Sequence, residues 1–97
     1  MRLLLVEDDR LLADGLSGQL EKAGFSVDTT YTAREAMVLG EQENYRAVIL
    51  DLGLPDGNGL DILRKWRRNR IAFPVLILTA RGDWHDKVEG LKAGADD

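Results

Sequence analysis

Residues 3–9 read Leu3-Leu4-Leu5-Val6-Glu7-Asp8-Asp9, an apolar run that ends in acids. A second run, Ala47-Val48-Ile49-Leu50, ends in the same way at Asp51. A stretch that is apolar at every position is typical of a parallel strand buried on both faces. If the two runs are strands of one parallel sheet, their acids meet at the edge formed by the carboxyl ends. Open α/β sheets bind their ligands at this edge.

Carboxylates gathered at one edge repel one another. The arrangement is stable only if a cation neutralises the charges or if one carboxyl group keeps its proton. Oxygen ligands without cysteine or histidine favour Mg²⁺. The sequence therefore predicts a magnesium-dependent reaction at an aspartate.

Length and composition predict one globular domain over residues 1–97. Hydrophobic residues make up 44% and charged residues 31% of the chain, as in ordinary globular proteins. No apolar stretch approaches the roughly 18 residues of a membrane-spanning helix, and the N-terminus does not have the pattern of a signal peptide. The absence of cysteine agrees with a reducing compartment, so we expect a cytoplasmic protein.

The net charge of −4 argues against nucleic-acid binding by this chain, because such binding uses a basic surface to neutralise phosphates. The one basic cluster lies at residues 64–70. We interpret it as the solvated face of a helix, whose apolar side would be formed by Leu60, Ile62, Leu63 and Trp66.

Strand and helix patterns alternate along the chain. Strands are predicted at 2–6, 25–30, 46–50 and 74–79, and helices at 10–22, 33–41, 60–70 and 84–93. The first helix carries leucines at 11, 12, 16 and 20 and is followed by Gly24, a typical C-terminal cap. Thr32 and Glu35 match the capping box of the second helix. Residues 52–59 are rich in Gly, Pro, Asp and Asn, which predicts a loop. This alternation predicts a parallel sheet with helices on both faces.

Four stretches together resemble the receiver domain of bacterial two-component response regulators, of the OmpR/PhoP type. They are Leu5-Val6-Glu7-Asp8-Asp9, Ile49-Leu50-Asp51-Leu52-Gly53-Leu54-Pro55-Asp56-Gly57-Asn58-Gly59, Leu76-Ile77-Leu78-Thr79-Ala80-Arg81 and Gly90-Leu91-Lys92-Ala93-Gly94-Ala95-Asp96-Asp97. The resemblance implies a flavodoxin-like (CheY-like) α/β fold with strand order 2-1-3-4. It also implies a fifth strand and a fifth helix, which are missing from this sequence.

By the same resemblance, Asp51 is the phosphoacceptor that takes a phosphoryl group from a sensor histidine kinase. Asp8 and Asp51 would ligate Mg²⁺ directly, Glu7 through water and Gly53 through its backbone carbonyl. The hydroxyl of Thr79 would bond to the phosphoryl group and so sense phosphorylation. Asp9 lies one position beyond the pattern and is interpreted as an acid at a helix start.

The family implies further features beyond Asp97, among them a lysine that pairs with the phosphoryl group and a DNA-binding output domain. Transcription control is therefore expected of the parent protein and not of these residues. We interpret the chain as a receiver domain that is incomplete at its C-terminus, either a fragment of a longer regulator or a domain that associates with a second copy.

Two other functions compete with this interpretation. A phosphatase of the haloacid dehalogenase type would place a second aspartate two residues after the nucleophile, where this chain has Gly53, so we expect no turnover enzyme. The alternative left open is a flavodoxin-like interaction module that does not switch.

Overall fold

A computed structural model describes residues 2–78 of the chain. Its main sheet is parallel and has the order β2-β1-β3-β6, formed by Ser26–Thr30, Arg2–Val6, Ala47–Asp51 and Val75–Leu78. They correspond to the four strands predicted in this chain, with β6 as the fourth, and their order is the predicted 2-1-3-4. The last residue predicted for the fourth strand, Thr79, and the helix predicted at 84–93 lie outside the described residues.

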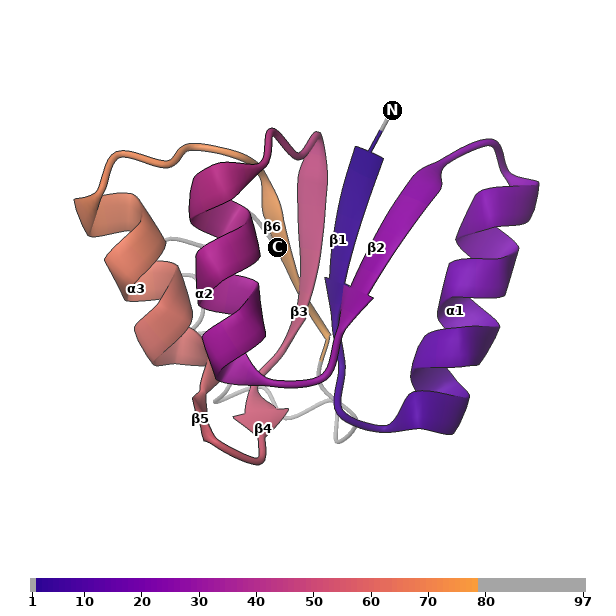
Figure 1. Cartoon of the computed structure of the whole chain (residues 1–97), viewed down its shortest axis with the longest axis horizontal. Helices are drawn as coiled ribbons and strands as arrows, with labels where there is room; N and C mark the ends of the chain where they lie inside the picture. Colours follow the sequence, from indigo (N-terminus) through magenta and orange to yellow (C-terminus); the bar gives the residue numbers. More distant parts are fainter. Residues whose placement is uncertain (1, 79–97) are drawn as a thin grey trace.

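Helices cover both faces of the sheet (Figure 1). Helix α1 (Arg10–Lys22) lies on one side, while α2 (Ala33–Gln42) and α3 (Gly59–Arg68) pack side by side on the other. Because successive side chains of a strand point to opposite faces, Leu4 and Val6 belong to the core beneath α2 and α3. The predicted doubly wound arrangement is therefore confirmed for the described residues.

Trp66 is the largest side chain of this core and is fully buried. Its ring meets Phe73 edge to face with the centroids 5.0 Å apart. It also lies directly against Gly40 of α2, where a β-carbon would come within 2.4 Å of the indole nitrogen. The predicted apolar side of α3 is confirmed, since Leu60, Ile62 and Leu63 are buried with Trp66.

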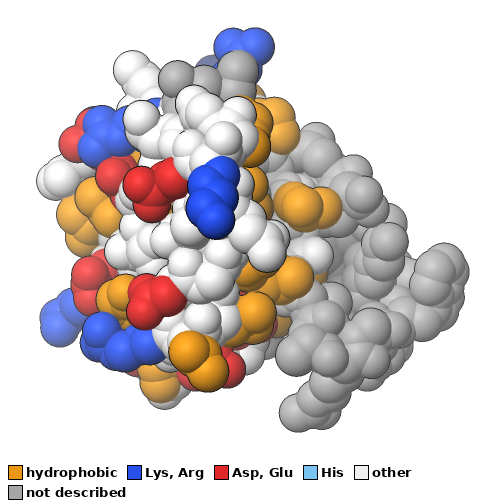
Figure 2. Space-filling model, turned by 90° about the vertical axis from the view of Figure 1, so that its right-hand side faces the viewer, with side chains coloured by type: hydrophobic (Ala, Val, Ile, Leu, Met, Phe, Trp, Pro, Cys, Tyr) orange, Lys and Arg blue, Asp and Glu red, His pale blue; other side chains and the backbone are white. Residues whose placement is uncertain are grey.

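The contact of α1 with the sheet differs from the prediction. Ala13 is the buried residue of this helix, whereas Leu11 is 86% and Leu12 is 40% exposed. Positions two apart on a helix differ by about 200° in direction, so a helix that buries Ala13 must turn Leu11 to solvent. Figure 2 shows that the face formed by α1 carries interspersed acidic and basic side chains together with exposed hydrophobic ones.

Two helix ends follow the predicted caps, and the end of α3 differs from its predicted position. Gly24 has a φ of 101° and closes α1, and Thr32 accepts a hydrogen bond from the amide of Glu35 at the start of α2. Helix α3 ends at Arg68, two residues before the predicted end. Arg70 takes the left-handed conformation with a φ of 61°, and the amide of Ile71 bonds back to the carbonyl of Trp66.

The loop predicted at 52–59 is in part wrong, because it contains a small antiparallel hairpin. Strand β4 (Gly53–Leu54) pairs with β5 (Gly57–Asn58), and Pro55 and Asp56 form the turn between them. Asn58 then accepts a hydrogen bond from the amide of Leu60 and begins α3. Within residues 2–78, no helix is both long and apolar enough to span a lipid bilayer.

Candidate functional site

The acids after β1 and at the end of β3 meet at the carboxyl edge of the sheet. Val6 pairs with Leu50 in the parallel register, which brings the next residues of both strands together. Carboxylate oxygens of Glu7, Asp8 and Asp51 all lie within 4.8 Å of one another. The structure thus brings together the three acids that the sequence predicted as metal ligands.

Glu7 is the most buried of the three acids, with 4% of its surface exposed. Its amide bonds to the carbonyl of Thr30, which fixes the backbone against β2. Within the described residues, its Oε2 atom has no hydrogen-bond partner. Burial and the neighbouring carboxyl groups of Asp51 and Asp8 raise the pKa of Glu7 to about 8, because all of them disfavour another negative charge. A buried carboxyl oxygen without a partner is costly unless a proton or a cation reaches it.

Asp8 and Asp9 are neighbours in sequence but have different surroundings. Asp8 is exposed and contributes to the acidic cluster. Asp9 is the N-cap of α1 and accepts a hydrogen bond of 3.1 Å from the amide of Leu12. The interpretation of Asp9 as an acid at a helix start is therefore confirmed, since its carboxylate is used as a cap.

The chain turns sharply after Asp51. The amide of Gly53 lies 3.4 Å from Asp51 Oδ1, and the amide of Gly59 donates to the carbonyl of Leu52. A β-carbon at Gly59 would come within 2.6 Å of the Asp51 carbonyl oxygen, so only glycine fits beside that strand end. These contacts keep Gly53 close to Asp51. Thr79 lies outside the described residues, and its role stays a prediction.

The donor set fits a divalent cation. Its three carboxylates are hard oxygen ligands, which suit Mg²⁺, and an exposed Asp8 beside a partly buried Asp51 leaves space for the waters that Mg²⁺ retains. A cation would also provide a partner for Glu7 Oε2, which has none among residues 2–78, and would relieve the repulsion that adds to burial in raising the pKa of this group.

Sequence reasoning missed Asp56, which it treated only as a turn residue. Both oxygens of this carboxylate bind the backbone of α2, at the amides of Ala33 and Arg34. No local pattern could have identified these partners, because 23 positions separate Asp56 from Ala33.

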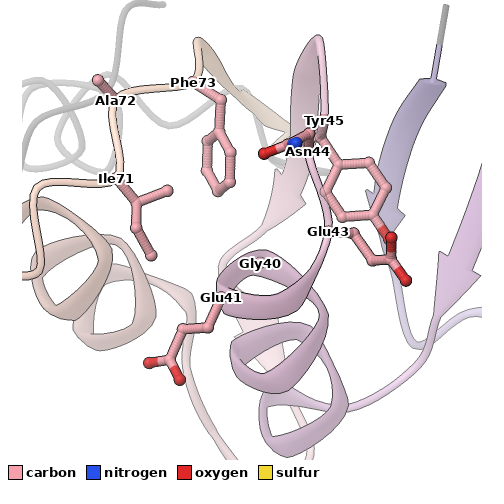
Figure 3. A pocket seen from close by; sticks show the side chains of 8 residues that line it. All are labelled: Gly40, Glu41, Glu43, Asn44, Tyr45, Ile71, Ala72 and Phe73. Carbon is pink, nitrogen blue, oxygen red and sulfur yellow. The ribbon is translucent and has the colours of Figure 1, made fainter.

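The opposite edge of the sheet holds a hollow of about 300 Å³ between the end of α2 and the segments that precede β3 and β6. Figure 3 shows Phe73 and Ile71 on one side of it, with Tyr45 and Glu43 directed away toward β1. The acids here are already bonded: Glu43 pairs with Arg2, and Glu41 accepts from the side chain of Asn69. We therefore place the candidate site at the carboxyl edge.

The amino-acid sequence matches the family model of the response regulator receiver domain over residues 3–97. It is 53% identical to the transcriptional regulatory protein PmrA of Pectobacterium parmentieri and 48% identical to the transcriptional regulatory protein PhoP of Escherichia coli K12. Each match includes all of this chain but only 44% of the relative, so the chain spans less than half the length of these relatives.

Solved structures match the fold closely. The receiver domain of the Francisella response regulator 1452 aligns with a TM-score of 0.92 and 31% identity, over 99% of this chain and 79% of that one. The response regulator TrrA of Thermotoga maritima, solved in complex with Mg²⁺ and BeF, aligns with a TM-score of 0.87 and 28% identity, over 98% of this chain and 81% of that one.

Proposed function

We propose, since the chain belongs to the family of response regulator receiver domains, that residues 1–97 act as one receiver domain whose Asp51 accepts a phosphoryl group from a sensor histidine kinase. The observation that carries the proposal is the acidic cluster at the carboxyl edge. Its three carboxylates lie within 4.8 Å of one another, and an oxygen of the buried one has no partner among residues 2–78.

In the proposed reaction, a carboxylate oxygen of Asp51 attacks the phosphorus of a phosphohistidine. The new O–P bond forms while the N–P bond breaks, and the imidazole of the kinase leaves. Asp51 is suited to this step because it is only partly buried at the end of β3, where a donor molecule can reach it. The product is an acyl phosphate on Asp51.

Asp8 and Asp51 would hold Mg²⁺ directly, Glu7 through a water molecule and Gly53 through its carbonyl oxygen. When bound, Mg²⁺ draws the phosphoryl oxygens toward an anionic nucleophile and screens their mutual repulsion. The raised pKa of Glu7 favours its protonated form at neutral pH without the metal, and a bound cation would favour release of that proton. The hydroxyl of Thr79 would then bond to the phosphoryl group and report its presence.

The relatives support a proposal for the biological role. PmrA and PhoP are transcriptional regulators, and this chain matches less than half of each. We therefore propose that phosphorylation of Asp51 in the cytoplasm controls transcription through an output domain of the parent protein. The chain would accept a phosphoryl group on its own aspartate and would not turn over small substrates. Pairing with a second copy is a further step that phosphorylation could control.

The test is phosphorylation of the 97-residue chain by acetyl phosphate with Mg²⁺, measured as the mass of the intact protein. The native chain should gain one phosphoryl group, and EDTA should prevent the gain. Asp51→Asn should remain unmodified. Glu43→Gln, which removes an acid from the opposite edge, should be labelled like the native chain. Labelling of Asp51→Asn, or none of the native chain, would contradict the proposal, and the second result would favour an interaction module that does not switch.

A further inference from the structure

We infer that Asp56 is a positioning residue, whose carboxylate fastens the hairpin after Asp51 to the N-terminus of α2 and thereby fixes the Gly53 carbonyl at the metal site. The inference rests on the proposed function, in which that carbonyl ligates Mg²⁺. Asp56 itself would touch neither the metal nor the phosphoryl group.

The contacts of Asp56 join segments that are distant in sequence. Oδ1 accepts a hydrogen bond of 2.6 Å from the amide of Ala33, and Oδ2 accepts one of 3.1 Å from the amide of Arg34. A helix N-terminus favours negative charge, because its first amides point outward without partners. Accordingly, these bonds lower the pKa of Asp56, with the Ala33 amide as the main cause.

Asp56 occupies the turn of the β4–β5 hairpin, and the rest of the hairpin is held as well. Gly53 pairs with Asn58 and Leu54 with Gly57, and the side chain of Leu54 is buried in the core. Gly57 lies against α2, where a β-carbon would come within 3.3 Å of that of Ala33. The hairpin begins two residues after Asp51, so its attachment to α2 sets where the Gly53 carbonyl lies.

Helix α2 also has a cap of its own at Thr32. A variant at this cap makes it possible to distinguish two roles of Asp56, capping α2 and holding the hairpin. Thr32 Oγ1 accepts from the amide of Glu35, while Asp56 serves the preceding amides of Ala33 and Arg34. Loss of either acceptor leaves amides at the same helix end unsatisfied. Only loss of the Asp56 carboxylate also releases the hairpin, so Thr32→Ala is a matched control for Asp56→Ala.

The experiment compares the native chain, Asp56→Ala, Asp56→Asn and Thr32→Ala. Mg²⁺ affinity is measured by titration, thermal stability by circular dichroism, and exchange of the Gly59 amide by NMR in metal-free protein. Asp56→Ala and Thr32→Ala should both lower the melting temperature, and Asp56→Ala should lower it more, because it removes the acceptor of two amides and Thr32→Ala that of one. Of these two variants, Asp56→Ala alone should weaken Mg²⁺ binding, by roughly tenfold, as expected for a residue that orients a ligand. It should also speed exchange at Gly59, whose amide bonds to Leu52 within this segment.

Asp56→Asn retains one acceptor, so its Mg²⁺ affinity and its Gly59 exchange should lie between those of the native chain and Asp56→Ala. If Asp56→Ala does not fold, Asp56→Asn provides the comparison. Unchanged Mg²⁺ affinity in the Asp56 variants, or an equal loss in Thr32→Ala, would overturn the inference. A native chain that binds no Mg²⁺ would overturn the proposed function instead. The exchange of Gly59 in metal-free protein would then still decide whether Asp56 holds the hairpin: faster exchange in Asp56→Ala alone supports this, and equal exchange rejects it.

Discussion

Both edges of the parallel sheet carry acids, but the surroundings of these acids differ in charge. At the amino edge, Arg2 forms ion pairs of 2.8 Å with Asp28 and 3.1 Å with Glu43, and the hydroxyl of Tyr45 donates to Asp28. At the carboxyl edge, none of the ion pairs found within residues 2–78 involves the acidic cluster of Glu7, Asp8 and Asp51.

This difference separates acids that are neutralised within the fold from acids that the proposed function assigns to a metal site. Asp28 and Glu43 are matched by Arg2, so they tie β1 to β2 and to the segment before β3 without a ligand. The acids of the carboxyl edge repel one another, and the burial of Glu7 increases the cost of that repulsion. A cation would relieve the repulsion at this edge, whereas Arg2 already neutralises the acids of the amino edge.

The largest expected effect is the difference in Mg²⁺ affinity between two single variants, one that removes an acid of the carboxyl edge and one that removes an acid of the amino edge. Asp8→Asn removes a proposed direct ligand and should weaken Mg²⁺ binding by roughly a hundredfold, the upper end of the loss seen when ligand-orienting partners are removed. Glu43→Gln removes one acid as well but should leave the affinity within about twofold, because surface charges beyond a Debye length are screened. Calorimetric titration of both variants measures the contrast. Equal losses would mean that net charge, and not a site, attracts the metal.

The acids of the carboxyl edge could be predicted from the sequence, because strand-end position is a local signal, whereas the ion pairs of Arg2 at the amino edge were not predicted. The runs before Glu7 and Asp51 are apolar throughout, so their acids had to meet at one edge once the sheet was parallel. The cap at Gly24 was predictable for a similar reason, since glycine adopts a positive φ without strain.

Features that depend on distant contacts could not be predicted. Arg70 ends α3 in a conformation usually taken by glycine, so no residue signalled the end. The β4–β5 hairpin is too short for an alternating pattern. The bonds from Asp56 to α2 exist only once the helices are packed. Glu7 is buried and Asp8 is exposed, and no local pattern indicated this difference between the two neighbours.

The second prediction concerns pH and the stability of the metal-free chain. An unfolded glutamate ionises near pH 4.5, whereas Glu7 in the folded chain keeps its proton up to about pH 8. Between these values the folded state binds more protons than the unfolded state, so the free energy of unfolding must fall as pH rises. We expect a loss of about 2 kcal/mol, less than the full shift in pKa implies, because Glu7 shares the repulsion with its neighbours.

Chemical denaturation at pH 5 and pH 8, with EDTA present, measures this loss. Glu7→Gln should remove most of the pH dependence, since glutamine fills the same space without titrating. Excess Mg²⁺ should restore stability at pH 8 in the native chain. If the native chain in EDTA were as stable at pH 8 as at pH 5, ionisation of Glu7 beside the other acids would not destabilise the fold, and the inferred repulsion would be wrong.

The smallest effect is expected at the amino edge. Tyr45→Phe removes the hydroxyl that donates a hydrogen bond of 2.7 Å to Asp28, while the ring and its burial remain. The free energy of unfolding should fall by about 1 kcal/mol, the usual contribution of one hydrogen bond. Since Arg2 still neutralises Asp28, the loss should be the same with Mg²⁺ and with EDTA. Denaturation under both conditions measures it, and a loss that depended on Mg²⁺ would mean that the two edges are coupled through the sheet and are not independent in function.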